Sequence, residues 1–219
     1  MATNDDRPRV LLVSFEFMEF FDDTYKPLIE ALSEKAAVQR VKTANPAIRT
    51  LEQDPKAVLI TDGGIANELG KYGRVWDAIL AYVRRGGTAI VMGHFSSFVK
   101  PDNIKPFFAK AGLSWERGSY HRTTTTLNRT NAGPMADKLP ASYSQKALSV
   151  SKVDPAHVWY ASTAESVVES HVFAPTSAHT PSEAAVALAV VGDGKLAYLG
   201  DVNAEDGSND AVLAMCGFL

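Results

Sequence analysis

Three short apolar runs constrain the fold of this chain more than any other feature of its sequence. They are RVLLVSF at residues 9–15, KAVLITDGG at 56–64 and TAIVMG at 88–93. These runs show no regular alternation of polar and apolar residues, which predicts strands that are buried on both faces. Amphipathic stripes typical of helices lie between them, at residues 22–37 and 75–83. Strands that alternate with helices favour a parallel sheet covered by helices on both faces.

The second half of the chain has a different pattern. Residues 115–129 alternate and are rich in threonine, which predicts an exposed strand or β-arm. Residues 132–156 contain prolines at 134, 140 and 155 and are expected to be mostly loop. Short strands are expected at 157–162 and 167–173.

The end of the chain returns to a regular pattern. Two apolar runs on either side of Gly192, Asp193 and Gly194 predict a β-hairpin, and residues 208–218 predict a closing helix. We therefore predict one domain over residues 1–219. It belongs to the α/β class, with a mostly parallel sheet and an irregular β-rich insertion at about 115–183.

Composition excludes several classes of function. The formal net charge is -3, whereas nucleic-acid-binding proteins carry clustered positive charge, so we expect no nucleic-acid partner. No window approaches roughly 18 uninterrupted apolar residues, and the polar N-terminus has no signal core. We therefore expect no membrane partner and a cytoplasmic location. The single cysteine, Cys216, excludes an internal disulfide and a cysteine-based zinc site.

Ligands of open parallel sheets bind beyond the carboxyl ends of the strands. That rule selects four turns of this chain, at residues 14–19, 62–67, 93–98 and 201–206. Their polar residues are Glu16, Glu19, Asp62, Asn67, His94, Ser96, Ser97, Asp201, Asn203, Glu205 and Asp206. We expect a small-molecule ligand at the edge where these turns meet.

His94 lies in a predicted strand-to-helix turn. A histidine has a pKa close to neutral pH, so it can act as a general acid or base, and Glu16 is the candidate carboxylate that orients it. We predict His94 and Glu16 as catalytic residues. The alternative is a histidine hydrogen-bonded to the backbone of a tight turn, with Glu16 solvated.

Asp62, Gly63 and Gly64 are candidate ligand-binding residues. The two glycines let the backbone approach a ligand closely. Backbone N–H groups near Gly64 and Ser96 are also candidates to stabilise negative charge on a substrate. The alternative for this segment is a plain turn in which Asp62 acts as a cap.

Ser96, Ser97, Asp201 and Asn203 complete the candidate ligand-binding set. The two serines do not match the G-x-S-x-G nucleophile pattern, so capping of a following helix is the alternative for them. Asp201 and Asn203 belong to an acidic segment that either supplies oxygen ligands to a cation or forms a polar surface loop.

We predict neither a cofactor nor a metal site. The first strand is not followed by the glycines of a dinucleotide-binding fingerprint, and no Walker A sequence is present. The remaining histidines, at 121, 157, 171 and 179, have no spacing typical of metal ligands.

The order of these motifs resembles the class I glutamine amidotransferase-like superfamily, which includes DJ-1/PfpI and ThuA-like proteins. The motifs are VLLVSFE with Glu16 at its end, VLITDGG, RRGGTAIVMGH and the ending GKLAYLGDVNAEDGSNDAVLAMCGF. The resemblance covers most of residues 9–112 and 184–219, and it implies a flavodoxin-like three-layer sandwich.

The resemblance also limits the chemistry. Members with amidotransferase or DJ-1-type activity place a cysteine in the turn after the fourth strand, and here that turn reads VMGHFSS. The nucleophile for glutaminase, deglycase or cysteine-hydrolase activity is therefore absent. ThuA-like proteins tend to show a histidine after a Gly-Gly-led strand, and GGTAIVMGH is similar, with His94 in that place.

Two hypotheses follow for the function. In the first, the protein is a hydrolase, lyase or isomerase that uses His94 for acid/base chemistry on a small polar molecule. In the second, it is a non-catalytic pseudoenzyme that acts as a ligand sensor or an oligomeric partner. The edge of the threonine-rich arm would then pair with another subunit in a homodimer.

Overall fold

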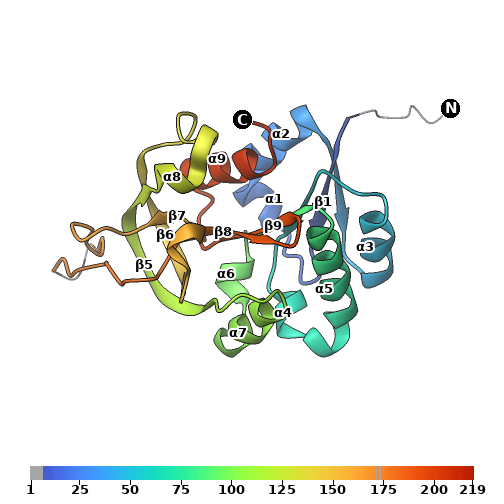
Figure 1. Cartoon of the computed structure of the whole chain (residues 1–219), viewed down its shortest axis with the longest axis horizontal. Coiled ribbons are helices and arrows are strands. Elements are labelled where there is room, and N and C mark those ends of the chain that lie inside the picture. Colours follow the sequence, from blue (N-terminus) through green and yellow to red (C-terminus); the bar gives the residue numbers. More distant parts are fainter. Residues whose placement is uncertain (1–6, 171, 173) are drawn as a thin grey trace.

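The computed structural model describes residues 7–170, 172 and 174–219, and the strands of these residues form one nine-stranded sheet (Figure 1). The strand order is β2-β1-β3-β4-β9-β8-β7-β5-β6. The first five strands in this order run parallel to one another. They are β2 (Ala37–Val41), β1 (Arg9–Val13), β3 (Ala57–Ile60), β4 (Thr88–Val91) and β9 (Gly194–Leu199). The predicted α/β class is therefore confirmed.

The other strands of the sheet are antiparallel to their neighbours. In sheet order they are β8 (Val186–Val191), β7 (Val158–Ala161), β5 (Glu116–Leu127) and β6 (Ser142–Ser151). Strands β8 and β9 form the hairpin predicted around Gly192, which has a positive φ of 63°. The expectation of a mostly parallel sheet is thus correct for the first five strands and fails for the rest.

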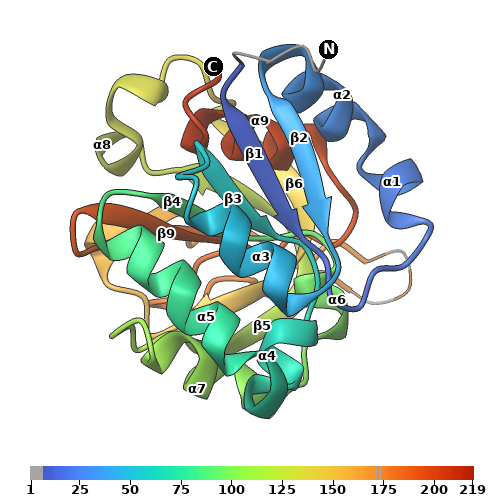
Figure 2. The same ribbon diagram turned by 90° about the vertical axis from the view of Figure 1, so that its right-hand side faces the viewer.

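Helices cover both faces of the parallel strands (Figures 1 and 2). On one face are α1 (Phe21–Thr24), α2 (Lys26–Lys35) and α9 (Asp206–Met215). On the other are α3 (Ala44–Leu51), α4 (Gly64–Asn67), α5 (Leu69–Arg84), α6 (Phe95–Phe98) and α7 (Pro101–Ala109). Three short helical turns follow later, α8 (Arg129–Ala132), η1 (Gly133–Met135) and η2 (Pro155–His157). Across the described ranges, no helix is both long and apolar enough to pass through a bilayer.

Successive side chains of β1 enter different cores because they point to opposite faces of the sheet. Val10 and Leu12 pack with the helix layer of α2 and α9, while Leu11 and Val13 pack with the layer of α3 and α5. Each of these side chains is at most 3% exposed, and burial of one such side chain stabilises a fold by about 1.5–3 kcal/mol. The continuous apolar run at residues 9–15 is therefore explained by two cores.

Helix α3 lies between β2 and β3, where the sequence pattern predicts no helix. Pro46 stands in its first turn, where the missing N–H of proline costs no helical hydrogen bond. Ala47 and Leu51 pack into the core. The apolar stripe of this helix is short, and its contacts with the sheet and α5 stabilise it.

Strand β6 lies within residues 132–156, so the expectation that this segment is mostly loop is wrong. One edge of β6 pairs with β5. At its other edge, the Leu148 N–H donates to the Gly200 carbonyl at 2.9 Å and the Val150 N–H donates to the Ala184 carbonyl at 3.0 Å. The antiparallel strands therefore curve, so that β6, the last strand of the sheet, contacts the residues that flank the β8–β9 hairpin.

The threonine-rich segment forms strand β5, as expected, and its side chains alternate between buried and exposed from Thr123 to Leu127, but its edges are paired and do not form a free arm. Strand β6 covers one edge, and residues 166–169 cover part of the other through a bond of 2.9 Å from the Glu169 N–H to the Arg122 carbonyl. Thr125 is only 1% exposed. Of the strand expected at 167–173, Val167 forms an isolated bridge with Ser177, and residues 171 and 173 lie outside the described residues.

Candidate functional site

The four turns selected from the sequence meet at one edge of the sheet. They follow β1, β3, β4 and β9, which are neighbours in the sheet and run in the same direction. Glu16, Asp62, His94 and Asp201 therefore lie along this edge, which we call the carboxyl edge. Their contacts divide them into separate groups.

The first group contains Asp62, Glu16 and Asn67. Asp62 is 4% exposed and accepts a hydrogen bond from the Gly64 N–H at 2.9 Å. Burial raises the pKa of Asp62 to about 6, and the Glu16 carboxylate adds to the rise, although nearby backbone N–H groups oppose it. Asn67 Nδ2 lies 3.4 Å from Glu16 Oε2 and donates to the Phe98 carbonyl at 3.0 Å. The group offers two carboxyl groups, of which Asp62 exchanges its proton close to neutral pH.

Gly63 and Gly64 are required by packing inside the protein. A Cβ atom at Gly64 would lie 2.8 Å from Glu16 Cγ, and one at Gly63 would lie 2.9 Å from the backbone nitrogen of Val99. The Gly64 N–H already donates to Asp62. This N–H is therefore engaged within the protein, in contrast to the expectation that it stabilises charge on a substrate.

His94 lies in an aromatic cage and is 4% exposed. Its ring centroid is 4.6 Å from that of Phe20, 5.1 Å from Phe21, 5.6 Å from Phe98 and 5.9 Å from Tyr25. Burial lowers the pKa of His94, because removal from water disfavours the charged form of the ring.

The pairing of His94 with Glu16 that the sequence predicts is not formed. Among the described residues, the contacts of His94 are aromatic rings, whereas the Glu16 carboxylate lies beside Asn67 and Asp62. The aromatic residues of α1 and of the turn before it pack around His94. Sequence order cannot reveal this packing because it depends on how α1 folds back over β4.

Ser96 and Ser97 lie inside α6, whose N-cap position is His94, so the capping role expected for them is wrong. Ser96 is 6% exposed, and its Oγ lies 3.1 Å from the Tyr198 hydroxyl and donates to the Leu199 carbonyl at 3.2 Å. Ser96 therefore ties α6 to β9. Ser97 is exposed on the outer side of α6.

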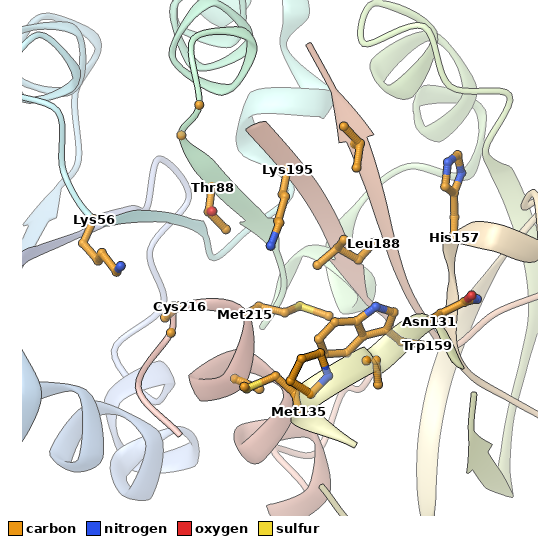
Figure 3. Close-up of a pocket in the computed structure, with 18 of the residues that line it drawn as sticks. Lys56, Thr88, Asn131, Met135, His157, Trp159, Leu188, Lys195, Met215 and Cys216 are labelled. Atoms are coloured by element: carbon orange, nitrogen blue, oxygen red, sulfur yellow. The ribbon is translucent and has the colours of Figure 1, made fainter. Parts of the chain in front are cut away.

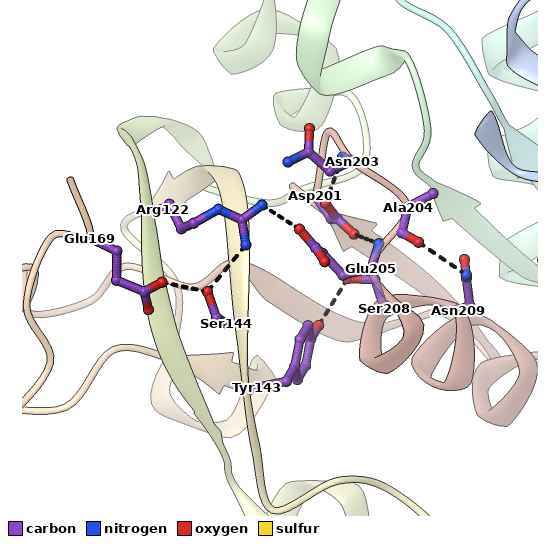
Figure 4. Close-up of polar contacts among 10 residues, drawn as sticks. All are labelled: Arg122, Tyr143, Ser144, Glu169, Asp201, Asn203, Ala204, Glu205, Ser208 and Asn209. Carbon is purple, nitrogen blue, oxygen red and sulfur yellow. Dashed lines mark hydrogen bonds and ion pairs between the residues drawn. The ribbon is translucent and has the colours of Figure 1, made fainter. Parts of the chain in front are cut away.

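Asp201 organises the turn that precedes α9 (Figure 4). It is 3% exposed and accepts the N–H groups of Asn203 at 2.8 Å and Glu205 at 2.7 Å. Burial raises the pKa of Asp201. Both carboxylate oxygens therefore accept backbone N–H groups of the turn. Among the described residues, no group of three or more His, Cys, Asp or Glu side chains could hold a metal ion.

Arg122 of β5 reaches the same turn and was not singled out by the sequence (Figure 4). It forms an ion pair with Glu205 and donates to Ser144 Oγ at 3.2 Å. When the side-chain amide of Asn203 is oriented so that its oxygen and its nitrogen both have hydrogen-bond partners, the oxygen accepts a hydrogen bond of 2.7 Å from Arg122. No local pattern marks one arginine in a threonine-rich strand, since the contact joins residues far apart in the chain.

No protein-family model and no curated protein sequence matches this chain. Solved structures do match it along nearly its whole length. The cytoplasmic protein STM1381 from Salmonella typhimurium LT2 is 13% identical and superposes with a TM-score of 0.60 over 96% of each chain. A ThuA-like protein from Parabacteroides merdae ATCC 43184 is 12% identical, with a TM-score of 0.52 over 96% of this chain and 91% of that protein.

A third match comes from a larger enzyme. The cold-adapted β-galactosidase from Rahnella sp. R3 is 15% identical, with a TM-score of 0.52, and 96% of this chain matches 31% of that enzyme. Identities this low show a shared fold. The ThuA-like neighbour agrees with the fold that the sequence resemblance implies, and membership of the amidotransferase-like superfamily stays a prediction.

Proposed function

We propose that this protein binds a small polar molecule at the carboxyl edge, on the surface formed by exposed Glu16 and half-buried Asn67, with the buried Asp62 carboxyl beside them. The observation that supports the proposal is the convergence of these polar side chains from two separate turns. Asn67 lies 3.4 Å from Glu16, and the Glu16 carboxylate contributes to the raised pKa of Asp62. Perturbed carboxyl groups gather at functional sites more often than elsewhere.

The surface favours a ligand that donates hydrogen bonds. Carboxylates accept hydrogen bonds and repel anions. The same edge also carries exposed rings. Phe98 is 42% exposed and its carbonyl accepts from Asn67, while Phe20 is 50% exposed, and both rings flank His94. An edge with accepting oxygens and exposed rings suits a molecule with hydroxyl or ammonium groups.

If the bound molecule is also transformed, Asp62 is the favoured proton acceptor. Both side chains are 4% exposed, so the choice rests on their protonation. The pKa of Asp62, about 6, lies near working pH, whereas burial lowers the pKa of His94. The enzyme would then be a hydrolase, lyase or isomerase without a cysteine nucleophile.

The non-catalytic alternative also has support. The enclosure of His94 and the absence of a cysteine in the turn at 93–98 favour a ligand sensor over an enzyme. A homodimer formed through β5 loses support, because β6 and residues 166–169 cover the edges of that strand.

Capture of metabolites by the immobilised protein, followed by mass spectrometry, tests the binding proposal. We expect the wild type to enrich a hydroxyl- or ammonium-bearing compound that Glu16→Gln and Asn67→Ala lose, because the first variant removes the negative charge and the second removes the amide. Glu34→Gln is the matched control, since Glu34 is an exposed glutamate on α2. Equal capture by all four proteins, or no capture by the wild type, contradicts the proposal.

A further inference from the structure

A groove of about 990 Å³ lies at the opposite, amino edge of the parallel strands (Figure 3). Its walls include the starts of β4 and β9, the end of α9 and residues 131–135 of the consecutive turns α8 and η1. Small-molecule pockets commonly enclose about 300–1,000 Å³, so the groove has room for such a ligand. None of Glu16, Asp62 and Asn67 lines it, so an inference about this groove does not rest on the proposed function.

The floor of the groove is apolar. The indole ring of Trp159 on β7 lies in the middle of it, close to Leu188 and Met215, and Met135 lies at its other side (Figure 3). Trp159 and Met215 are only 6% and 7% exposed, so half-buried Leu188 and Met135 supply more of the accessible floor than they do. The floor therefore offers a small apolar surface above a packed layer.

Positive charge surrounds this floor. Lys56, which precedes β3, and Lys195 of β9 are exposed, and both side chains point into the groove (Figure 3). Neither lysine forms an ion pair with a described residue. Asp54 is the acidic residue among those that line the groove, and its carboxylate forms an ion pair with the guanidinium of Arg85 at 2.8 Å. A concave wall that carries unpaired cations concentrates anions.

We propose that the groove binds a small anion that carries an apolar ring, with the ring on the floor at Leu188 and Met135 and the anionic group between Lys56 and Lys195. An uncharged ring uses the floor alone, and an inorganic anion uses the lysines alone, so a ligand with both parts binds most tightly. Cys216 lines the same groove and takes no covalent part. Burial raises the pKa of its thiol to about 12, which keeps it protonated.

Two fluorescent probes with the same ring system separate the contributions of charge and apolar surface. One is 8-anilinonaphthalene-1-sulfonate, and the other is N-phenyl-1-naphthylamine, which lacks the sulfonate. We expect the folded protein to bind the anionic probe roughly tenfold more tightly than the neutral one, as two charge-assisted contacts suggest. Added salt weakens binding of the anionic probe and leaves binding of the neutral probe nearly unchanged.

Variants locate the probe in the groove. The double variant Lys56→Gln/Lys195→Gln is expected to weaken the anionic probe by roughly tenfold and the neutral probe by less than about twofold. Val190→Glu adds a negative charge at the rim, where Val190 is 67% exposed, and is expected to weaken the anionic probe as well. Met135→Ala weakens both probes, because it removes half-buried apolar surface from the floor. Lys100→Gln is the matched control, because Lys100 is exposed beyond the carboxyl edge.

Several outcomes overturn the proposal. One is equal affinity of the wild type and the double lysine variant for the sulfonate probe, at unchanged melting temperature. A second is a loss of affinity for the sulfonate probe on Lys100→Gln that equals the loss in the double lysine variant. A third is equal affinity of the wild type for the two probes. Absence of probe binding together with a doubled mass in light scattering also overturns it, because a second copy then covers the groove.

Discussion

The two edges of the parallel strands differ in the residues that they gather and in the space that they leave. At the carboxyl edge, Asp62, His94 and Asp201 are each less than 5% exposed. A cavity beside Asp201 measures about 10 Å³, which is room for one water molecule. At the amino edge, exposed Lys56 and Lys195 border a groove of about 990 Å³. At the carboxyl edge the buried acidic groups therefore leave little internal space, so a ligand there contacts the exposed surface at Glu16, whereas the amino edge holds an open groove.

The difference arises from the segments that cover each edge. Short helices α1 and α6 lie close to the carboxyl ends, and Phe20, Phe21 and Phe98 pack around His94. At the amino edge, the covering segment consists of the consecutive turns α8 and η1, and residues 131–135 form one wall of the groove. Strand direction therefore determines where the polar turns gather, but the covering segments determine whether a cavity remains.

A pair of glycine variants tests this comparison with the largest expected effect. Gly93 at the carboxyl edge and Gly217 at the amino edge have similar positive φ angles of 68° and 76°. A Cβ atom at Gly93 would lie 2.8 Å from Phe21 Cε2, whereas one at Gly217 meets Lys56 Nζ at 3.5 Å, an ordinary contact. We expect Gly93→Ala to lower the free energy of unfolding by about 3–4 kcal/mol, and Gly217→Ala by about 1 kcal/mol, in urea titrations. Equal losses would mean that the two edges are packed alike.

The pH dependence of stability sharpens the comparison. The pKa of Asp62 is 3.8 in the unfolded chain and about 6 in the folded protein, so its contribution is full below pH 3.8 and is lost as pH rises through 6. Asp62→Asn removes this dependence and retains an acceptor for the Gly64 N–H. We expect the variant to be more stable than the wild type at pH 8, by up to about 3 kcal/mol, and to lose this advantage near pH 4.

Cys216→Ala is the amino-edge control for that experiment. The Cys216 thiol has a pKa of about 12, so it remains protonated between pH 4 and pH 8. The effect of this substitution on stability is therefore expected to be the same at both pH values. Denaturant titrations of both variants at the two pH values provide the measurement, and a pH-independent effect of Asp62→Asn would contradict the assignment.

A smaller effect is expected at His94. Because burial lowers its pKa below 6.5, its contribution to stability is full above pH 6.5 and declines as pH falls through the folded pKa. His94→Phe keeps a ring in the cage and cannot be protonated. Its melting temperature relative to the wild type should therefore rise between pH 7.5 and pH 5. Parallel melting curves across that range would indicate that His94 is not enclosed in solution.

The sequence predicts the parallel half of the fold well and the antiparallel half poorly. Strands β1, β3 and β4 are continuous apolar runs because both faces are buried, and that signal is local. Strand β6 was missed because its partly buried polar residues resemble a loop. Gln145 is 0% exposed and donates to Thr125 at 2.9 Å, a pairing that arises only when β5 and β6 lie side by side.

The candidate site likewise has one part that the sequence predicts and another that it does not. The sequence by itself determined that Glu16, Asp62, His94 and Asp201 lie at one edge, because strand direction follows from the order of strands and helices. Only the tertiary structure decided that Glu16 lies beside Asn67 and that aromatic rings enclose His94. It also decided that the groove lies at the other edge. Side-chain contacts and cavities depend on segments far apart in the chain, and no local pattern encodes how closely those segments pack.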